Sequence, residues 1–308
     1  MPPAGAPGSQ VTVECRVYSA AQQIAAPQAY ETLPFQAMPE LPEVETTRRG
    51  ISPLVVGRRV VATKIYDRRL RWPVPRALEK NLTGRTIEGL DRRSKYLLFR
   101  VGPDTLLVHF GMTGSLRAFT RVPPLDAHDH FDIVLDSGIT LRYRDPRRFG
   151  ALLWLRPPAE AHPLLASLGP EPFDPACDSR YLWGATRRRK VAIKLALMDN
   201  GLVVGVGNIY ANESLFHAGI RPTIAAYRLS RPRFARLLDA VRQTLRNAIA
   251  KGGSTLRDYV DSRGEPGYFQ LDYYVYGREG LPCRVCGTAI KSVRQGGRAT
   301  SYCPRCQH

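Results

Sequence analysis

The sequence predicts a multidomain α+β protein with an N-terminal β-sandwich, a helical middle part and a small C-terminal cysteine module. Short β-type runs fill the first half, helical patterns follow a proline-rich stretch, and four cysteines lie near the end. The chain has 308 residues, 44% of them hydrophobic, which is enough for packed cores in two ordinary domains.

The charge balance points to a polyanionic partner. Lys and Arg number 45 against 27 Asp and Glu, so the formal net charge is +18. Such a basic chain favours nucleic acid as its partner. No apolar run reaches the length of about eighteen residues that a membrane span needs, so membrane association is not expected.

Taken in order, the first half reads as extension, helix and strands. Residues 1–37 are rich in Ala, Pro and Gln without periodicity, so we expect a disordered extension, or sequence upstream of the true start. A short helix is expected over 43–51. Short strands separated by turn residues predict the sandwich, and they are expected at 59–66, 95–101, 106–110, 115–119, 131–135, 140–143 and 151–155.

The second half reads as linker, helices and cysteine module. Prolines at 168–176 indicate a linker, and helices are expected at 195–200, 209–218, 231–250 and 255–260. Asn208 is the expected cap of the second helix, and Gly252 and Gly253 should end the third. The predicted domains are therefore 38–167 and 177–278, with the cysteine module at 279–308.

Met38 and the residues after it read like the beginning of a protein. If Pro39 is the first residue of the mature chain, it carries a free secondary amine beside Glu40 and Glu43. A terminal amine has a pKa of about 8, against about 10.4 for lysine, so more of it is nucleophilic at neutral pH. Attack on a sugar aldehyde carbon would give an iminium. Inside a longer chain the same nitrogen is an amide and cannot react, so we expect residues 1–37 to be absent from the active protein.

The C-terminal cysteines have metal-site spacing. Cys283 and Cys286 are separated by sixteen residues from Cys303 and Cys306, which predicts a four-thiolate zinc site; an iron centre or disulfides are the alternatives. Gly296 and Gly297 suit the tip of a β-hairpin in the spacer, and Arg298 follows them directly. Clustered thiols and the lack of a secretory signal favour a reducing, cytoplasmic setting.

Three further groups suit contacts with DNA. Gly205 to Asn208 precede a helix and could cradle an anion, and the basic residues around Arg189 and Lys194 suit phosphates. Met112, Arg147 and Phe149 lie in glycine-flanked loops and could fill the gap left by a flipped base. His128 and His130 resemble a metal pair without a third ligand, so hydrogen bonds to phosphate or backbone are favoured. Core packing, helix capping and solvated charge are the ordinary alternatives for these groups.

Several separated motifs, taken together, resemble the bacterial formamidopyrimidine-DNA glycosylase family. They are PELPEVE at 39–45, SKYLL at 94–98, HFGMTGS at 109–115, DPRRFGA at 145–151, LMDN at 197–200, VVGVGNIYANESL at 203–215, GYF at 267–269, VYGR at 275–278 and GRATSYC at 297–303. The resemblance covers residues 38–308 in order. It implies a β-sandwich, a helix-two-turn-helix domain and a β-hairpin zinc finger holding one structural Zn²⁺.

The resemblance also implies an activity and roles for matching residues. The protein would be a bifunctional DNA glycosylase and AP lyase of base excision repair, removing 8-oxoguanine and formamidopyrimidines and nicking by β,δ-elimination. Pro39 would form the Schiff base, and Glu40 would donate or relay a proton. Lys95 would serve β-elimination, and Arg298 δ-elimination and phosphate clamping.

The implied partner is double-stranded DNA containing oxidised purines or abasic sites, bound by a monomer at the bacterial nucleoid. A loop at 262–268 would close over 8-oxoguanine. The sister endonuclease VIII group, which prefers oxidised pyrimidines, and a non-catalytic DNA-binding zinc protein remain the alternatives. The implied DNA contacts are His128, Arg147, Arg189, Lys194 and Asn208, with a wedge of Met112, Arg147 and Phe149.

Overall fold

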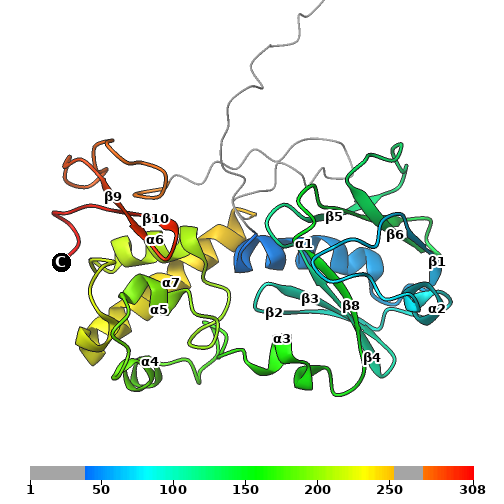
Figure 1. The fold of residues 1–308 in the computed structure, drawn as a ribbon, viewed down its shortest axis with the longest axis horizontal. Helices are drawn as coiled ribbons and strands as arrows, with labels where there is room; N and C mark the ends of the chain where they lie inside the picture. The colour runs from blue at the N-terminus through cyan, green and yellow to red at the C-terminus, as the bar shows by residue number, and fades with distance from the viewer. Residues whose placement is uncertain (1–38, 253–272) are drawn as a thin grey trace, which may run out of the picture. The chain divides into compact units, whose positions relative to one another are not determined.

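The computed structural model describes residues 39–252 and 273–308, which belong to one compact unit (Figure 1). The expected extension at 1–37, the helix at 255–260 and the loop at 262–268 lie outside the described residues. No helix in the described part of the chain is long and apolar enough to cross a membrane.

The first helix, α1 (Leu41–Val55), is longer than the expected 43–51. Glu40 is its N-cap, and Pro42 occupies the first turn, where a missing N–H costs nothing. The helix also includes Pro53 in its last turn, where the missing N–H leaves the carbonyl of residue 49 without its usual helical donor. Leu41 packs in the core of the helical part, whereas Val44 packs in the core of the sandwich. Helix α1 therefore belongs to both halves of the protein.

The predicted β-sandwich is confirmed as two antiparallel four-stranded sheets (Figure 1). Their inner faces enclose one apolar core, including Phe99, Phe131 and Tyr143. The expectation missed β2 because its sequence GLDRR has a single large apolar residue, and it also missed α2 (Leu78–Leu82). The first sheet has the order β1 (Val60–Ile65), β6 (Asp129–Leu135), β7 (Thr140–Arg144) and β5 (Ser115–Phe119); the second has β2 (Gly89–Arg93), β3 (Tyr96–Val101), β4 (Asp104–His109) and β8 (Ala151–Leu155).

The helical part follows the turn η1 (Ala159–Ala161) and the short α3 (Pro163–Ala166). The longest helix, α7 (Arg231–Ala250), matches the expected bounds, and its Phe234, Leu237, Val241 and Leu245 are buried at helical spacing. Helix α4 was not expected. The remaining elements are α4 (Ser179–Thr186), α5 (Ile193–Leu197), α6 (Asn208–His217) and η2 (Ala226–Arg228).

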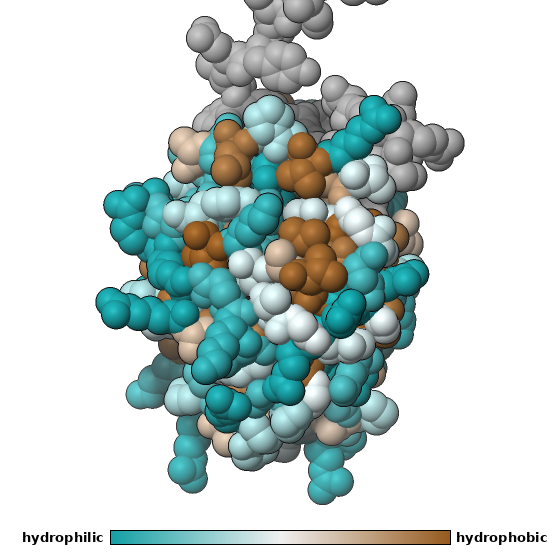
Figure 2. All heavy atoms as spheres, turned by 90° about the vertical axis from the view of Figure 1, so that its right-hand side faces the viewer, coloured by the Kyte–Doolittle hydropathy of each residue, from teal (hydrophilic) through white to brown (hydrophobic). Residues whose placement is uncertain are grey.

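The expected C-terminal hairpin is formed by β9 (Lys291–Gln295) and β10 (Arg298–Tyr302). Gly296 and Gly297 make its tip with φ of 52° and 74°, the left-handed pair that a tight hairpin turn requires. Figure 2 shows a different face, at the side of Figure 1 where β1 lies, on which hydrophilic side chains separate several smaller apolar groups.

Candidate active site

The carboxylate of Glu40 is held by the start of helix α6. Its Oε2 accepts a hydrogen bond from the Gly207 amide at 2.6 Å, and its Oε1 accepts one from the Ile209 amide at 3.0 Å. Helix N-termini present free N–H groups and a partial positive charge, so they suit a buried carboxylate. A side chain at Gly207 would place its Cβ 2.3 Å from the Glu40 carboxyl carbon, so glycine is needed for this close approach.

A second carboxylate, Glu43, lies beside the first. The Glu40 amide donates to Glu43 Oε2 at 2.8 Å, and the Tyr210 hydroxyl donates to Glu43 Oε1 at 2.6 Å. Burial raises the pKa of Glu40 to about 6, and the Glu43 charge adds to this, while Lys95 and the two amides oppose it. A carboxyl with such a pKa can exchange a proton near neutral pH.

Pro39 directly precedes this acid and is half-buried. In the full chain its nitrogen is joined to Met38 as an amide, so it has no nucleophilic lone pair. The geometry supports the sequence expectation in one respect: the position that could carry a terminal amine is next to the acid with the raised pKa.

Lys95 lies in the two-residue turn between β2 and β3 and is buried. Burial lowers the pKa of its ammonium; the charges of Glu40 and Glu43 oppose this, and Arg298 adds to it. Lys95 therefore shares one electrostatic environment with Glu40 and Arg298. The structure thus brings together three of the four residues expected to carry catalysis, and Pro39 is bonded to one of them.

Arg298 is exposed at the beginning of β10, directly after the hairpin tip. The tip packs against α5, since a Cβ at Gly296 would lie 3.0 Å from a methyl of Leu195. The charge of Arg298 lowers the pKa of both Lys95 and Lys194, so the hairpin places Arg298 close enough to act on these two groups.

Lys194 contacts the hairpin from helix α5. Its side chain is fully buried, and its ammonium donates to the Ala299 carbonyl at 2.9 Å and the Thr300 hydroxyl at 2.7 Å. Burial and the nearby Arg298 lower its pKa to about 8, against the opposing charge of Glu40. Through these contacts Lys194 holds the hairpin that carries Arg298, and its expected contact with phosphate stays a prediction.

Asn208 is the first residue of α6, not its cap. Gly207 is the N-cap, and Glu40 satisfies the amides that a capping side chain would otherwise bind. Asn208 Oδ1 is buried without a hydrogen-bond partner among the described residues, which leaves an acceptor at the site. Arg189, expected to contact phosphate, is paired with Asp199 in the free protein and is partly exposed.

The two loops expected to enter DNA are joined through Asp145. Its carboxylate accepts hydrogen bonds from the Thr113 hydroxyl at 2.6 Å and from the Gly150 amide at 2.8 Å. Gly111 packs so closely on the other loop that a Cβ would lie 2.3 Å from the Phe149 carbonyl carbon. The backbones of the two loops are therefore fixed to each other and support the side chains of Met112 and Phe149.

The tips of these loops remain accessible. Arg147 is exposed, Phe149 is 43% exposed, and the Arg147 guanidinium lies 4.8 Å from the centre of the Phe149 ring. Met112 is half-buried. The neighbouring Arg148 instead pairs with Asp67 at 2.8 Å, so the two adjacent arginines have different partners.

The histidines do not form a metal site with other ligands among the described residues. His130 is buried, and its Nε2 bonds the Asp145 carbonyl at 2.9 Å, as the backbone alternative proposed. His128 is half-buried, and its carbonyl accepts a hydrogen bond from the Asp145 amide at 3.0 Å.

The four C-terminal cysteines converge on one point. Their sulfur atoms all lie within 4.8 Å of one another, with Cys283 and Cys306 at 3.9 Å and Cys286 and Cys303 at 3.4 Å. Tetrahedral zinc with Zn–S bonds of about 2.3 Å needs sulfurs about 3.8 Å apart, so the set fits one Zn²⁺. Few apolar residues surround the cysteines, chiefly Phe216, Val275 and Ile290. A bound metal would therefore stabilise this module in place of a large hydrophobic core.

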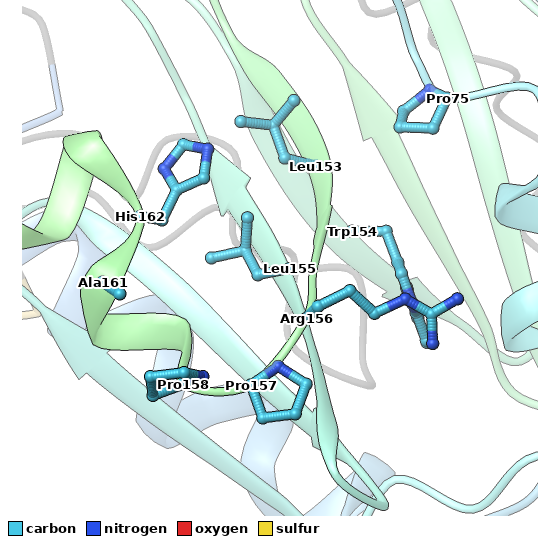
Figure 3. A pocket seen from close by; sticks show the side chains of 9 residues that line it. All are labelled: Pro75, Leu153, Trp154, Leu155, Arg156, Pro157, Pro158, Ala161 and His162. Carbon is cyan, nitrogen blue, oxygen red and sulfur yellow. The ribbon is translucent and has the colours of Figure 1, made fainter.

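A separate hollow lies at the end of β8, away from these groups. Figure 3 shows it lined by Leu153, Leu155, Pro157, Pro158 and His162, and its volume is about 370 Å³. It contains none of the expected site residues, so it is not the candidate active site.

Sequence reasoning missed three charged groups that are buried or partly buried. Glu213 accepts hydrogen bonds from the amides of Tyr274, Val275 and Tyr276 at 2.8 to 3.0 Å. Arg92 and Glu171 form an ion pair beside Lys95. Their partners are far away in the chain, so no local pattern could reveal them.

The comparisons with known proteins agree with this geometry. Family models match residues 38–152 as the formamidopyrimidine-DNA glycosylase N-terminal domain, 168–260 as its H2TH domain and 280–308 as the zinc finger found in FPG and IleRS. Formamidopyrimidine-DNA glycosylase from Thioalkalivibrio sulfidiphilus is 57% identical over 270 residues, which cover 88% of this chain and 100% of the relative. The protein of that name from Paraburkholderia phytofirmans is 58% identical over 278 residues, with the same coverage of 88% and 100%.

Solved structures give the same result. The Lactococcus lactis enzyme, bound non-covalently to DNA containing an abasic site, matches with a TM-score of 0.78 and 33% identity, covering 87% of this chain and 99% of that one. The Thermus thermophilus protein matches with a TM-score of 0.76 and 42% identity, covering 87% and 98%. This chain therefore belongs to the formamidopyrimidine-DNA glycosylase family.

Proposed function

We propose that the protein is a DNA glycosylase with AP lyase activity that removes oxidised purines from duplex DNA in base excision repair. The observation that carries this proposal is the buried Glu40, placed directly after Pro39 and within the field of Lys95. The family's structures with abasic-site DNA and with Fapy-dG-containing DNA support the substrate class. The net charge of +18 suits a phosphate backbone.

The reaction would begin at the amine of a chain that starts at Pro39. The amine attacks C1′ of the damaged nucleotide, the bond from C1′ to the base breaks, and the base leaves with a proton relayed by Glu40. The amine nitrogen loses its proton, and the sugar ring then opens: the C1′–O4′ bond breaks, O4′ takes a proton, and an iminium forms between C1′ and the nitrogen. The iminium acidifies the C2′ proton, whose loss expels the 3′ phosphate, and a second elimination expels the 5′ phosphate. Lys95 serves the first elimination, and Arg298 clamps phosphate and serves the second.

Recognition would use the exposed loops and the zinc finger. Met112, Arg147 and Phe149 fill the space of the extruded base, which offsets the unstacking cost of a few kcal/mol. His128, Arg189, Lys194 and Asn208 contact the DNA backbone. Lys194 also holds the hairpin. The zinc ion, bound by the four cysteines, supplies a rigid structural centre.

This function fits a domain division into catalysis at 38–167 and DNA binding at 177–278 and 279–308, joined by the linker 168–176. We place the enzyme at the nucleoid in the bacterial cytoplasm, because its substrate is chromosomal DNA there.

Borohydride trapping on an 8-oxoguanine:cytosine duplex tests the proposal. The chain that begins at Pro39 should be trapped covalently, and peptide mapping should place the link on Pro39. Preferential trapping on an oxidised pyrimidine would support the endonuclease VIII alternative. Tight DNA binding without trapping on any lesion or abasic site would support the non-catalytic one.

A further inference from the structure

The turn that carries Lys95 is held in an unusual backbone conformation. Ser94, the first of its two residues, has φ of 55°, a left-handed value that disfavours residues with a Cβ. Its hydroxyl is buried and has no hydrogen-bond partner within the described residues. The turn must therefore be held through its backbone groups.

Two charged side chains hold those groups. The Ser94 amide donates to Glu171 Oε1 at 2.7 Å, and the Ser94 carbonyl accepts from Arg92 Nη1 at 2.9 Å. Arg92 and Glu171 also bind each other at 2.8 Å. The ion pair thus binds both the amide and the carbonyl of Ser94, the residue before Lys95.

Glu171 comes from the linker, which is itself tied to the Glu40 site. The Gly169 amide donates to the Asn200 carbonyl at 2.8 Å, and the Val204 amide donates to the Pro170 carbonyl at 3.1 Å. Asn200 and Val204 belong to the loop that leads to Gly207, whose amide binds Glu40. One linker therefore sets both the Lys95 turn and the loop that holds the acid.

Arg92 adds a third connection, to helix α1. Its Nε donates to Glu45 Oε2 at 3.1 Å, and Glu45 lies in α1 five residues after Glu40. The side chains of Arg92, Glu45 and Glu171 are only 11%, 10% and 22% exposed. Removing one charge from such a buried group leaves its partners uncompensated, so the arrangement is sensitive to each member.

We propose that Arg92 and Glu171 are positioning residues for Lys95: they fix the Ser94–Lys95 turn relative to Pro39 and Glu40. This inference rests on the proposed function. It requires that loss of the clamp slows the step that depends on Lys95 while the amine of Pro39 still attacks C1′.

The same sheet offers a matched control. Asp104 lies beside the turn at the other end of β3, is 2% exposed, and pairs with both Arg85 and Arg156. Like Glu171, which also pairs with Arg93, it has two arginine partners, but it is more deeply buried than Glu171 and does not contact the Ser94–Lys95 turn. Asp104→Asn therefore reports what losing a buried carboxylate does to stability alone.

The test uses the chain that begins at Pro39, which keeps every described residue, and a duplex with a preformed abasic site. Glu171→Ala should slow strand cleavage in single turnover by roughly 10- to 100-fold, because small misplacements of a catalytic group have effects of this size. Borohydride trapping should stay close to that of the unaltered protein. Asp104→Asn should lower the unfolding temperature without changing the ratio of cleavage to trapping.

A double-mutant cycle makes the test specific. If Glu171 acts through Lys95, adding Glu171→Ala to Lys95→Ala should slow cleavage little further, because interacting residues are not additive. Full additivity, or equal losses of cleavage and trapping, would overturn the inference. If Glu171→Ala does not fold, the isosteric Glu171→Gln takes its place in the same cycle.

The outcomes also separate this inference from the proposed function. An unaltered protein that neither traps nor cleaves would refute the function. A protein that does both, is impaired by Lys95→Ala and is unaffected by Glu171→Ala and Glu171→Gln would refute only the positioning role.

Discussion

The groups assigned to chemistry and the groups assigned to DNA recognition are held in opposite ways. Glu40 and Lys95 are 2% and 9% exposed, and each lies within a network reaching far along the chain. Phe149 is 43% exposed, and the backbone of its loop is held by Asp145 and by the close packing of Gly111. Bond-breaking groups gain from a dry, fixed setting, because charges act more strongly there and need no rearrangement. A wedge must instead present an uncovered tip.

The largest expected effect concerns the terminal amine of Pro39, which belongs to the buried catalytic groups. A protein verified to retain Met1 should give essentially no borohydride-trapped product, because an amide nitrogen cannot form an iminium. The chain beginning at Pro39 should be trapped efficiently on the same lesion duplex. Intact mass measurement must establish each N-terminus. Equal trapping by both proteins would refute the terminal-amine mechanism.

The second effect concerns the zinc ion of the C-terminal cysteine module, which belongs to the groups assigned to DNA recognition. Cys303→Ser or chelation should remove the zinc, found at about one ion per chain, and unfold the hairpin, because the module has little core of its own. DNA affinity should fall at least tenfold, in line with the loss of Arg298 and neighbouring contacts. Metal analysis and a binding titration at fixed salt check this. Full affinity without zinc would exclude a structural role.

The third effect concerns the buried acid. Glu40→Gln should slow base release about 100-fold or more, as expected for loss of a general acid or base. It should also destabilise the fold by about 1–3 kcal/mol, since an amide NH₂ would face a backbone N–H. Single-turnover excision and urea unfolding measure the two parts. An unchanged excision rate would remove Glu40 from the proton relay.

Glu40 also makes stability depend on pH in a defined direction. Its pKa is about 6 in the folded protein against 4.5 as the ordinary value, so the folded state binds the proton more tightly. This contribution is complete below pH 4.5 and is lost as the pH rises through 6, in all about 2 kcal/mol. The unfolding free energy of the unaltered protein relative to Glu40→Gln should therefore decline between these values. A difference that rises with pH would contradict the assigned environment.

The smallest effect concerns the wedge. Arg147→Ala should reduce discrimination of the base opposite the lesion by about 1–3 kcal/mol, the usual value of a specific base contact. Arg148→Ala is the matched control, because that arginine pairs with Asp67. Competition binding with different opposite bases measures the effect. Equal losses on damaged and undamaged duplexes would make Arg147 an ordinary phosphate contact.

Local patterns in the sequence predicted the elements whose stability is local. Helix α7 begins and ends where its apolar spacing and flanking residues indicate, and the hairpin forms at Gly296 and Gly297. Strand β2 escaped prediction because its sequence GLDRR lacks the usual apolar alternation, and it is held by pairing with β3. Pattern reading therefore works where the residues that stabilise an element lie within it.

The candidate site shows the same limit. Spacing and motif resemblance identified Glu40, Lys95 and the cysteines, because their chemistry is visible in residue type. The burial of Lys194 and the capping of α6 by Glu40 depend on partners more than a hundred residues away. Arg92 and Glu171 were not singled out for the same reason, because they lie 79 positions apart. Only the fold reveals what such residues touch.

The hydrogen bonds between Glu40 and the start of helix α6 have a consequence for the synthesis of the protein. Glu40 and the amide of Gly207 are 167 positions apart, so a nascent chain carries the acid long before the groups that fix it have been translated. A truncated product that ends before α6 would keep Pro39 and Lys95 but lack the cradle for Glu40. The surroundings of the acid can therefore be completed only after translation has passed the start of α6.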